Sequence, residues 1–286
     1  MKKIFKIIIK KFAKNFVRIA YTNKIGRYFT EHLAKYIFEQ KMNVNYNNIK
    51  LAFYSPNRLI KFRIDTFSSK EPETLSWIEK FNQNSIFWDI GANIGLYSIY
   101  AALKHSDIEI ISFEPSTSNL RILSRNISIN KLEEKIKINQ LPLTKDQNQY
   151  LMFEESEFIE GWSMNTFGAG IDFEGKSMQP KNRYKIFGTN INYLIENNIL
   201  SIPNYIKIDV DGIEHLILEG ASDHLDNSEI RSMSIELNEN FKDQVNSVLK
   251  IMDKSNFRFK HKKHASMFDN SDKFSKIFNY IFEKQK

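Results

Sequence analysis

The stretch WDIGANIG, from Trp88 to Gly95, constrains the fold more than any other part of the chain. It follows a short apolar run and leads directly into LYSIYAA, an apolar segment of helical length. A strand that ends in a glycine-containing turn and continues as a helix is the opening unit of a parallel α/β sheet. The pattern therefore predicts a strand over 85–90 and a helix over 95–104.

Strands and helices continue to alternate after this unit. Helices are predicted over 117–130, 213–219 and about 241–252, and strands over 107–114, 135–141, 205–210 and 231–237. Strands separated by helices of this length predict a doubly wound, mostly parallel sheet. The segments FRFKHKK (257–263) and FNYIF (278–282) are expected to add antiparallel strands at its C-terminal edge.

The region before residue 83 has a different organisation. We expect a basic helical extension and lead-in over 1–82, and then the α/β domain over 83–286 with an insertion at about 142–204. Within the lead-in the chain is expected to be helical to about residue 40. The shorter segments predicted after it are a loop over 43–48, strands over 49–56 and 59–67, and a helix over 73–81.

The net charge of +7 is concentrated at the start of the chain. Residues 1–18 contain seven Lys or Arg and no acid, which accounts for the whole excess. The remainder is balanced, so a nucleic-acid groove is not expected in the main body. Cysteine is absent, which excludes disulfide scaffolds and thiolate zinc sites.

Residues 1–20 have the pattern of a basic amphipathic helix. Apolar residues recur at helical spacing with lysines opposite, at Phe5, Ile8, Phe12, Phe16 and Ile19. Such a helix lies on a membrane surface, or it packs on its own domain with a solvated lysine face. The chain contains no run of about 18 uncharged apolar residues, so no membrane-spanning helix is predicted. We expect a cytoplasmic protein, with peripheral contact at the inner membrane surface as one alternative.

The turn after the first strand is placed to bind a ligand. In a doubly wound sheet, ligands bind at the carboxyl ends of the strands. Gly91 and Gly95 permit positive φ and a close backbone approach. Glu114 ends the next strand, 19 residues after Gly95, where a carboxylate can accept both hydroxyls of a ribose. The turn is therefore expected to bind a nucleoside-like cofactor.

The residue types in this turn favour one cofactor over another. A dinucleotide requires G-x-G-x-x-G, whereas the chain has Asp89-x-Gly91-x-Asn93-x-Gly95. An acid would repel a pyrophosphate but suits a cofactor that carries an amino group and a sulfonium. These features favour S-adenosylmethionine.

Four stretches resemble the FkbM family of S-adenosylmethionine-dependent methyltransferases. They are RIDTFSSKEPETLSWIEKF, FWDIGANIGLYSIYAA, ISFEPSTSNLRILSRNISIN and YIKIDVDGIEHLILEGA, and together they cover about 60–260. The resemblance implies a class I methyltransferase (Rossmann-like) fold and O-methylation of sugars, polysaccharides or other hydroxylated metabolites. By position it implies that the cofactor-binding residues are Asp89, Gly91, Ala92, Asn93, Gly95, Glu114 and Pro115.

Three acids follow the fourth predicted strand. Asp209 ends that strand, and Asp211 and Glu214 lie on the next loop and helix start. At a strand's carboxyl end they can orient a hydroxyl or accept its proton, so they are the predicted catalytic residues. Acids at a helix N-terminus are also favourable without any catalytic role, and this alternative applies most to Glu214.

The same edge could hold a divalent cation. Asp209, together with Glu236 and Asn238 on the fifth strand, would supply oxygen ligands suited to Mg²⁺ or Ca²⁺. Such a cation would lower the pKa of an acceptor hydroxyl. Alternatively, Glu236 and Asn238 cap the following helix or contact the substrate.

The insertion at 142–204 is rich in aromatic and small polar residues. Trp162, Phe167 and Phe173 could stack on a sugar ring, and Ser163 and Asn165 could bond its hydroxyls. Alternatively, the insertion is a small β-structure whose aromatic side chains form its own core.

Taken together, these features predict an enzyme that methylates a hydroxyl of a sugar, glycan or related metabolite. The alternative is a catalytically silent binding protein with a methyltransferase fold at a membrane surface. An RNA or protein methyltransferase is disfavoured, because the chain lacks the N/D-P-P-Y/F turn used for amino groups.

Overall fold

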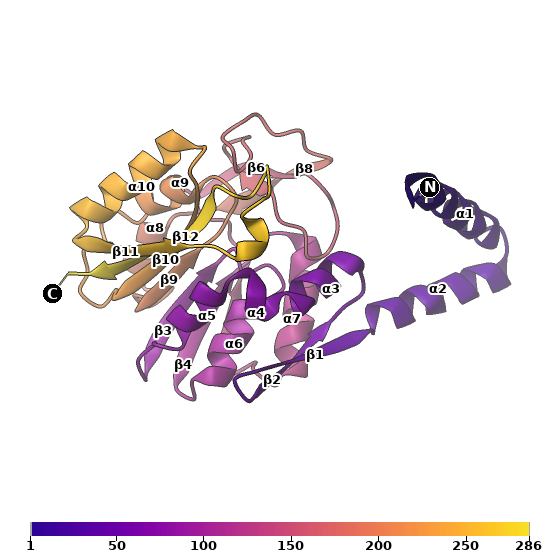
Figure 1. The fold of residues 1–286 in the computed structure, drawn as a ribbon, viewed down its shortest axis with the longest axis horizontal. Coiled ribbons are helices and arrows are strands. Elements are labelled where there is room, and N and C mark those ends of the chain that lie inside the picture. Colours follow the sequence, from indigo (N-terminus) through magenta and orange to yellow (C-terminus); the bar gives the residue numbers. More distant parts are fainter. Residues whose placement is uncertain (1, 286) are drawn as a thin grey trace.

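The structure is a computed structural model and describes residues 2–285. Its centre is a seven-stranded sheet in the order β11-β12-β10-β9-β3-β4-β5 (Figure 1). The strands are β3 (Ser85–Ile90), β4 (Ile108–Phe113), β5 (Ile136–Asn139), β9 (Tyr205–Ile208), β10 (Ser232–Asn238), β11 (Phe257–Lys263) and β12 (Ile277–Lys284). The predicted doubly wound, mostly parallel sheet is confirmed.

The predicted antiparallel pairing at the C-terminal edge is confirmed. β12 pairs antiparallel with both β10 and β11. The chain therefore folds back after β11 and inserts its last strand between β10 and β11. Only β12 is reversed, and the edge strand β11 runs in the same direction as the parallel strands.

Helices cover both faces of the sheet, because the strands are apolar on both sides. Neighbouring strand residues point to opposite faces, so Phe87 lies in one hydrophobic core and Trp88 in the other. The first core includes residues of α5 (Pro72–Ile78), α6 (Leu96–Lys104) and α7 (Thr117–Ile129). The second includes residues of α8 (Ile191–Glu196), α9 (Glu214–Glu219) and α10 (Lys242–Lys254).

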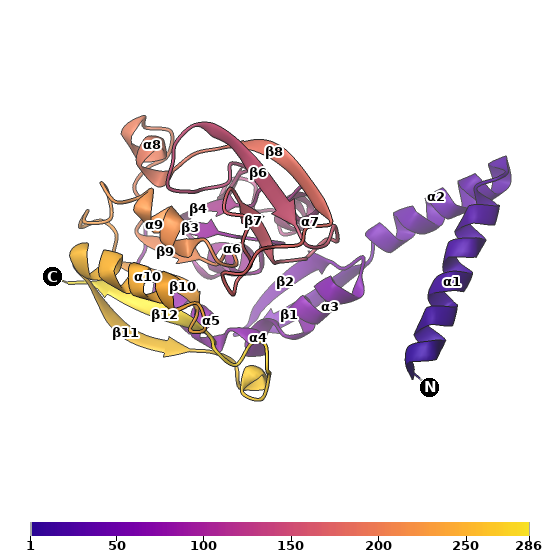
Figure 2. The ribbon, with the colours of Figure 1, turned by 90° about the horizontal axis from the view of Figure 1, so that it is seen from above.

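The lead-in packs on the first core. It contains the antiparallel hairpin β1 (Lys41–Tyr46) and β2 (Ile49–Tyr54), and then α3 (Arg58–Asp65) and α4 (Phe67–Lys70). Leu51, Phe53 and Ile60 are fully buried in the same core as Phe87. Two further helices, α1 (Lys2–Ala20) and α2 (Lys24–Phe38), precede the hairpin, and Figure 2 shows them extending away from the body.

Two local predictions for the lead-in were wrong. Residues 43–48, predicted as a loop, belong mostly to β1, and the turn is confined to Asn47 and Asn48. Both residues have positive φ (47° and 62°), as a tight hairpin turn requires. Residues 59–67, predicted as a strand, form α3 and the start of α4. The side chain of Asn57 caps α3 by accepting the Ile60 N–H at 2.9 Å.

The insertion forms a separate three-stranded antiparallel sheet over the carboxyl ends of the central strands. Its strands are β6 (Gln149–Glu155), β7 (Asn165–Phe167) and β8 (Asn182–Gly188), in the order β7-β6-β8. Phe153, Phe167 and Ile213 form its small core. A short 3₁₀ helix, η1 (Ser266–Phe268), lies between β11 and β12.

Candidate functional site

The predicted turn after β3 is held against the end of β4. The Gly91 and Ala92 N–H groups both donate to the Phe113 carbonyl, at 3.0 and 2.9 Å. Gly91, Asn93 and Gly95 all have positive φ, of 86°, 52° and 85°. A Cβ at Gly91 would lie 1.9 Å from the Asp209 carbonyl oxygen. The turn therefore requires glycine at this position and brings β3 close to the segment after β9.

We expect Gly91→Ala to destabilise the protein by roughly 3 kcal/mol or more, because the new Cβ meets backbone rather than a movable side chain. Gly170→Ala is the matched control. Gly170 also has positive φ, but a Cβ there would meet only Glu154 Oε2 at 3.5 Å. Thermal unfolding of the two variants should show a much larger drop in Tm for Gly91→Ala, and equal drops would contradict this role of the turn.

Glu114 lies where the sequence predicts a carboxylate. It is 5% exposed, and it accepts the Asn93 and Ser116 N–H groups, each at 2.8 Å. Burial raises its pKa to about 7, although these hydrogen bonds favour the charged form. Glu114 therefore connects the β3 turn to the end of β4.

Two cavities adjoin at this edge of the sheet. The first cavity is lined by the turn and by the ends of β4 and β9, including Gly91, Asn93, Glu114, Pro115 and Asp209. The second cavity lies between α3, the insertion and the segment before β12, and its walls include Phe62, Glu73, Phe173, Phe268, Phe274 and Asn279. Asp211 and Glu236 line both cavities. Ala92 lines a smaller pocket beside the turn with Tyr97, Lys207 and Asp209.

Two of the predicted cofactor-binding residues line none of these cavities. Asp89 is 1% exposed and lies beneath the turn, where it accepts a hydrogen bond from the Ser98 hydroxyl at 2.5 Å. Burial raises its pKa. Gly95 faces α7, where a Cβ would lie 2.6 Å from Leu123 Cδ1. The structure thus gives both residues a supporting place rather than a cofactor-contacting one.

Asp209 is ion-paired with a buried lysine. Lys207 Nζ lies 2.6 Å from Asp209 Oδ2 and 3.8 Å from Glu71 Oε2. Burial alone would raise the pKa of Asp209, but the positive charge of Lys207 dominates and lowers it to about 2. Asp209 is therefore charged at neutral pH and a weak base.

Asp211 has the opposite electrostatic setting. It has a φ of 61° and accepts the Met164 N–H at 2.6 Å. Burial, together with repulsion from Asp209, raises its pKa to about 6. This carboxylate is ionised at neutral pH and more basic than Asp209, so it suits proton transfer better.

Glu214, the third predicted catalytic acid, lines neither cavity. It is 2% exposed, and it accepts N–H groups of Val210 and Gly212 and the Gln244 side-chain amide, the last at 2.6 Å. Burial raises its pKa to about 7. These contacts fix the loop that carries Asp211 at the start of α9, which agrees with the structural alternative.

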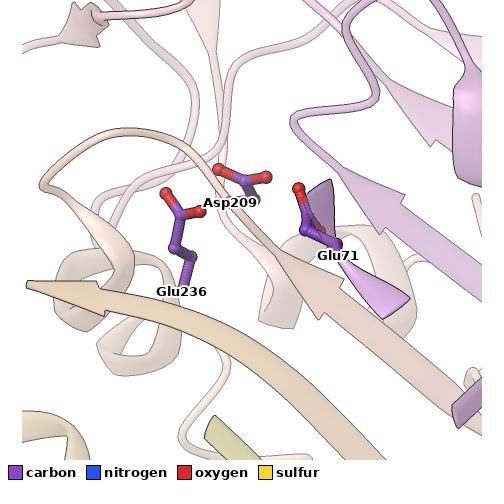
Figure 3. Close-up of side chains that lie close together, drawn as sticks. All are labelled: Glu71, Asp209 and Glu236. Atoms are coloured by element: carbon purple, nitrogen blue, oxygen red, sulfur yellow. The ribbon is translucent and has the colours of Figure 1, made fainter. Parts of the chain in front are cut away.

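The predicted cation site does not form as expected. Figure 3 shows Asp209 and Glu236 pointing toward Glu71, which the sequence reasoning did not include. Asn238 lies outside this group, because its amide donates to the Phe173 carbonyl and accepts the Asn240 N–H, both at 3.0 Å. The Lys207 ammonium already supplies positive charge to Asp209 and Glu71. Glu71, Asp209 and Glu236 each offer a carboxylate oxygen within 4.8 Å of the others, so two of the three predicted ligands lie together and a cation there stays a hypothesis.

We expect exhaustive EDTA treatment to leave enzymatic activity unchanged, because Lys207 supplies the positive charge in this cluster. A calorimetric titration with Mg²⁺ should likewise show no saturable heat. Mg²⁺ binding that is lost in Glu236→Gln, together with activity that requires added Mg²⁺, would restore the metal hypothesis.

The insertion closes over the first cavity through its Gly161–Trp162 segment. The side-chain amides of Asn93 and Asn119 both donate to the Trp162 carbonyl, at 2.9 and 3.0 Å. Arg63 Nε donates to the Gly161 carbonyl at 2.6 Å. Trp162, Ser163, Asn165 and Phe167 line the first cavity, and Phe173 lines the second. Phe167 also belongs to the small core of the insertion, which agrees with the alternative that its aromatic side chains form a core of their own.

Four site residues were missed by sequence reasoning: Arg63, Lys70, Glu71 and Lys207. The first three precede β3 in the chain, and only the packing of the lead-in brings them to the sheet's carboxyl edge. Lys207 did have a signal, since it interrupts the apolar strand YIKIDV immediately before an acid. A buried lysine is seldom found without a charged partner.

The sequence matches a known protein family. Residues 89–262, more than half of it, match the family described as the methyltransferase FkbM domain. The chain belongs to this family. Its FkbM domain includes the β3 turn, Glu114, Asp209, Asp211 and Glu236, and the family and fold together support a methyl-transferring enzyme.

Individual relatives are more distant. Methyltransferase sdnD of Sordaria araneosa is 36% identical over 67 residues, which is 23% of this chain and 26% of that protein. The chain therefore matches only about a quarter of that relative's length.

Solved structures show similarity of fold alone. A protein from Streptococcus mutans described as a SAM-dependent methyltransferase has a TM-score of 0.50 and 11% identity, over 85% of this chain and 55% of that chain. An FkbM methyltransferase from Methylobacillus flagellatus KT has a TM-score of 0.48 and 13% identity, over 79% of this chain and 52% of that chain.

Proposed function

We propose that this FkbM-family protein is an S-adenosylmethionine-dependent O-methyltransferase that acts on a hydroxyl of a sugar, glycan or related metabolite. The observation that carries the proposal is the position of Asp211. Its carboxylate lines both the cavity beside the β3 turn and the adjoining aromatic-walled cavity. A proton acceptor at that junction is in reach of a cofactor site and an acceptor site at once.

The first cavity has the chemistry that S-adenosylmethionine requires. Glu114 can accept the ribose hydroxyls, since each carboxylate oxygen can take more than one hydrogen bond. Asn93 Oδ1 is buried and has no hydrogen-bond partner among residues 2–285, so it is available to a ligand donor. The ionised Asp209 and Asp211 favour a cation beside them. These residues fit the cofactor.

Asp211 and Asp209 would have different roles in the reaction. When bound, S-adenosylmethionine supplies a methyl group activated by a positively charged sulfur. Asp211 would accept the proton that the acceptor hydroxyl loses, because its pKa of about 6 leaves it both ionised and basic at neutral pH. Asp209, held by Lys207, would orient the hydroxyl and keep negative charge in the cavity.

The second cavity suits a neutral hydroxylated acceptor. Phe173, Phe268 and Phe274 offer flat apolar surfaces for a sugar ring. Glu73 Oε2 and Asn279 Oδ1, on the same cavity wall, are buried acceptors without a hydrogen-bond partner among the residues that the structure describes. Hydroxyl donors of a sugar would satisfy them.

A nucleic-acid acceptor is not part of this proposal. Asp209, Asp211 and Glu236 line the first cavity, and Glu71, Glu73, Asp211 and Glu236 line the second. The charged carboxylates of Asp209 and Asp211 would repel a phosphate group in the first cavity.

The test is incubation with ¹³C-methyl S-adenosylmethionine and a panel of hydroxylated acceptors, amines and RNA, followed by NMR of the product. We expect the label in an O-methyl ether. Label on nitrogen or in RNA would overturn the acceptor class. Saturable binding of both cofactor and acceptor with no transfer would instead favour the catalytically silent alternative.

A further inference from the structure

The N-terminal arm, defined as α1 and α2 (residues 2–38), leaves its apolar side chains in solvent. Figures 1 and 2 show it extending away from the body of the protein. Phe12 on α1 is 71% exposed and Ile25 on α2 is 83% exposed. A concentration of exposed large apolar side chains on two helices is typical of a surface that binds another protein or a membrane.

Five apolar side chains of α1 form one stripe. Phe5, Ile8, Phe12, Phe16 and Ile19 recur at helical spacing and are all exposed. The basic residues of α1 lie mostly on the other side of the helix, and α1 contains no acid. This is the geometry of a helix that lies in a membrane interface with its apolar side down.

α2 continues the same design. Its exposed Ile25, Phe29, Leu33 and Tyr36 also recur at helical spacing. The two stripes meet at the bend of the arm, where the rings of Phe16 and Phe29 lie 6.4 Å apart. The arm is therefore larger than the single amphipathic helix that the sequence predicts over residues 1–20.

The arm is held to the body at its root. Arg125 Nη1 donates to the Phe38 carbonyl at 2.7 Å, and the Arg121 guanidinium lies 3.9 Å from the Phe38 ring centroid. Both arginines are on α7. In the described chain, no helix has the length and apolar character needed to cross a membrane.

The charge of the arm favours an anionic lipid surface over a second copy of the chain as its binding partner. Residues 1–38 contain ten Lys or Arg and a single acid, Glu31. A second copy of the arm would bring another ten cations against the first. An anionic lipid surface would attract them, at about 1 kcal/mol for each basic residue near it.

We propose that the arm docks the protein on an anionic membrane surface, with both apolar stripes in the boundary between headgroups and acyl chains. This inference is independent of the methyl-transfer proposal. It stands on the exposure, spacing and charge of α1 and α2, and its test uses no methyl donor.

The test is flotation of the full-length protein with vesicles of phosphatidylcholine alone, or of phosphatidylcholine with about one third phosphatidylglycerol. Phe12→Ser should weaken binding to the anionic vesicles by about tenfold or more. Lys10→Gln with Lys14→Gln should weaken it by about 25-fold, and high salt should release much of the wild type. Ile199→Ser and Lys250→Gln, at exposed positions on the body, are matched controls and should bind as the wild type does.

The proposal is overturned if the wild type fails to float with anionic vesicles, or floats equally with both kinds. It is also overturned if the arm variants and the body controls bind alike. A wild-type dimer that Phe12→Ser converts to a monomer, without vesicle binding, would assign the surface to a second copy. The Tm of the body should stay constant in all variants, because these side chains are exposed.

Discussion

Asp211→Asn should lower kcat by about 10²- to 10⁴-fold, which is the usual contribution of a general base. Asparagine keeps an oxygen that can accept the Met164 N–H, so the loop should hold its shape while the proton acceptor is lost. The KM for S-adenosylmethionine should change much less than kcat, because Asp209 keeps its negative charge in the same cavity. Asp243→Asn, at an exposed position in the first turn of α10, is the control and should retain full activity.

The pH profile provides a second check of the same assignment. Burial and Asp209 raise the pKa of Asp211 to about 6, so its carboxylate form grows as pH rises through that value. Wild-type activity should therefore rise through about pH 6 and fall off below it. An Asp211→Asn enzyme with wild-type kcat and the same acid limb would remove Asp211 from the mechanism.

Glu114→Gln should weaken cofactor binding by about 1–3 kcal/mol, or roughly 5- to 150-fold in Kd. The substitution removes the charge that the ribose hydroxyls would meet and leaves the side chain's shape. Because burial raises the pKa of Glu114 to about 7, wild-type affinity should also increase as pH rises through 7, and the variant should lose that dependence.

The matched control for Glu114→Gln is Glu109→Gln. Glu109 is near the start of β4, the strand that Glu114 follows, and its carboxylate is ion-paired with Lys137 at the protein surface. Equilibrium dialysis with labelled S-adenosylmethionine at pH 6 and 8 measures both effects. Equal affinities in the two variants would mean that Glu114 does not contact the cofactor.

The parts of this site that could be predicted are those determined locally. Gly91, Asn93 and Glu114 lie within one strand-turn-helix-strand unit, so their spacing alone places them together. The same holds for Asp209 and Asp211, because strand order brings the end of β9 beside β3. The relative positions of these residues follow from local spacing and strand order, so they can be predicted from the sequence.

The predictions were wrong where tertiary packing determines which side chains meet or which secondary structure forms. Asn238 is two residues from Glu236 on the same strand, and its side chain serves the turn before α10 rather than the acidic group. Glu71 completes that group from a helix terminus more than 100 residues away in sequence. The α3 segment has apolar residues compatible with either period, and the Asn57 cap decides for helix.

The most direct test of the central claim is a calorimetric titration of the protein with S-adenosylhomocysteine, and separately with NADH. We predict saturable one-to-one binding of S-adenosylhomocysteine that Glu114→Gln weakens. We predict no binding of NADH, because the β3 turn lacks the G-x-G-x-x-G pattern that a dinucleotide requires. Tight binding of NADH with none of S-adenosylhomocysteine would contradict the assignment of this cavity.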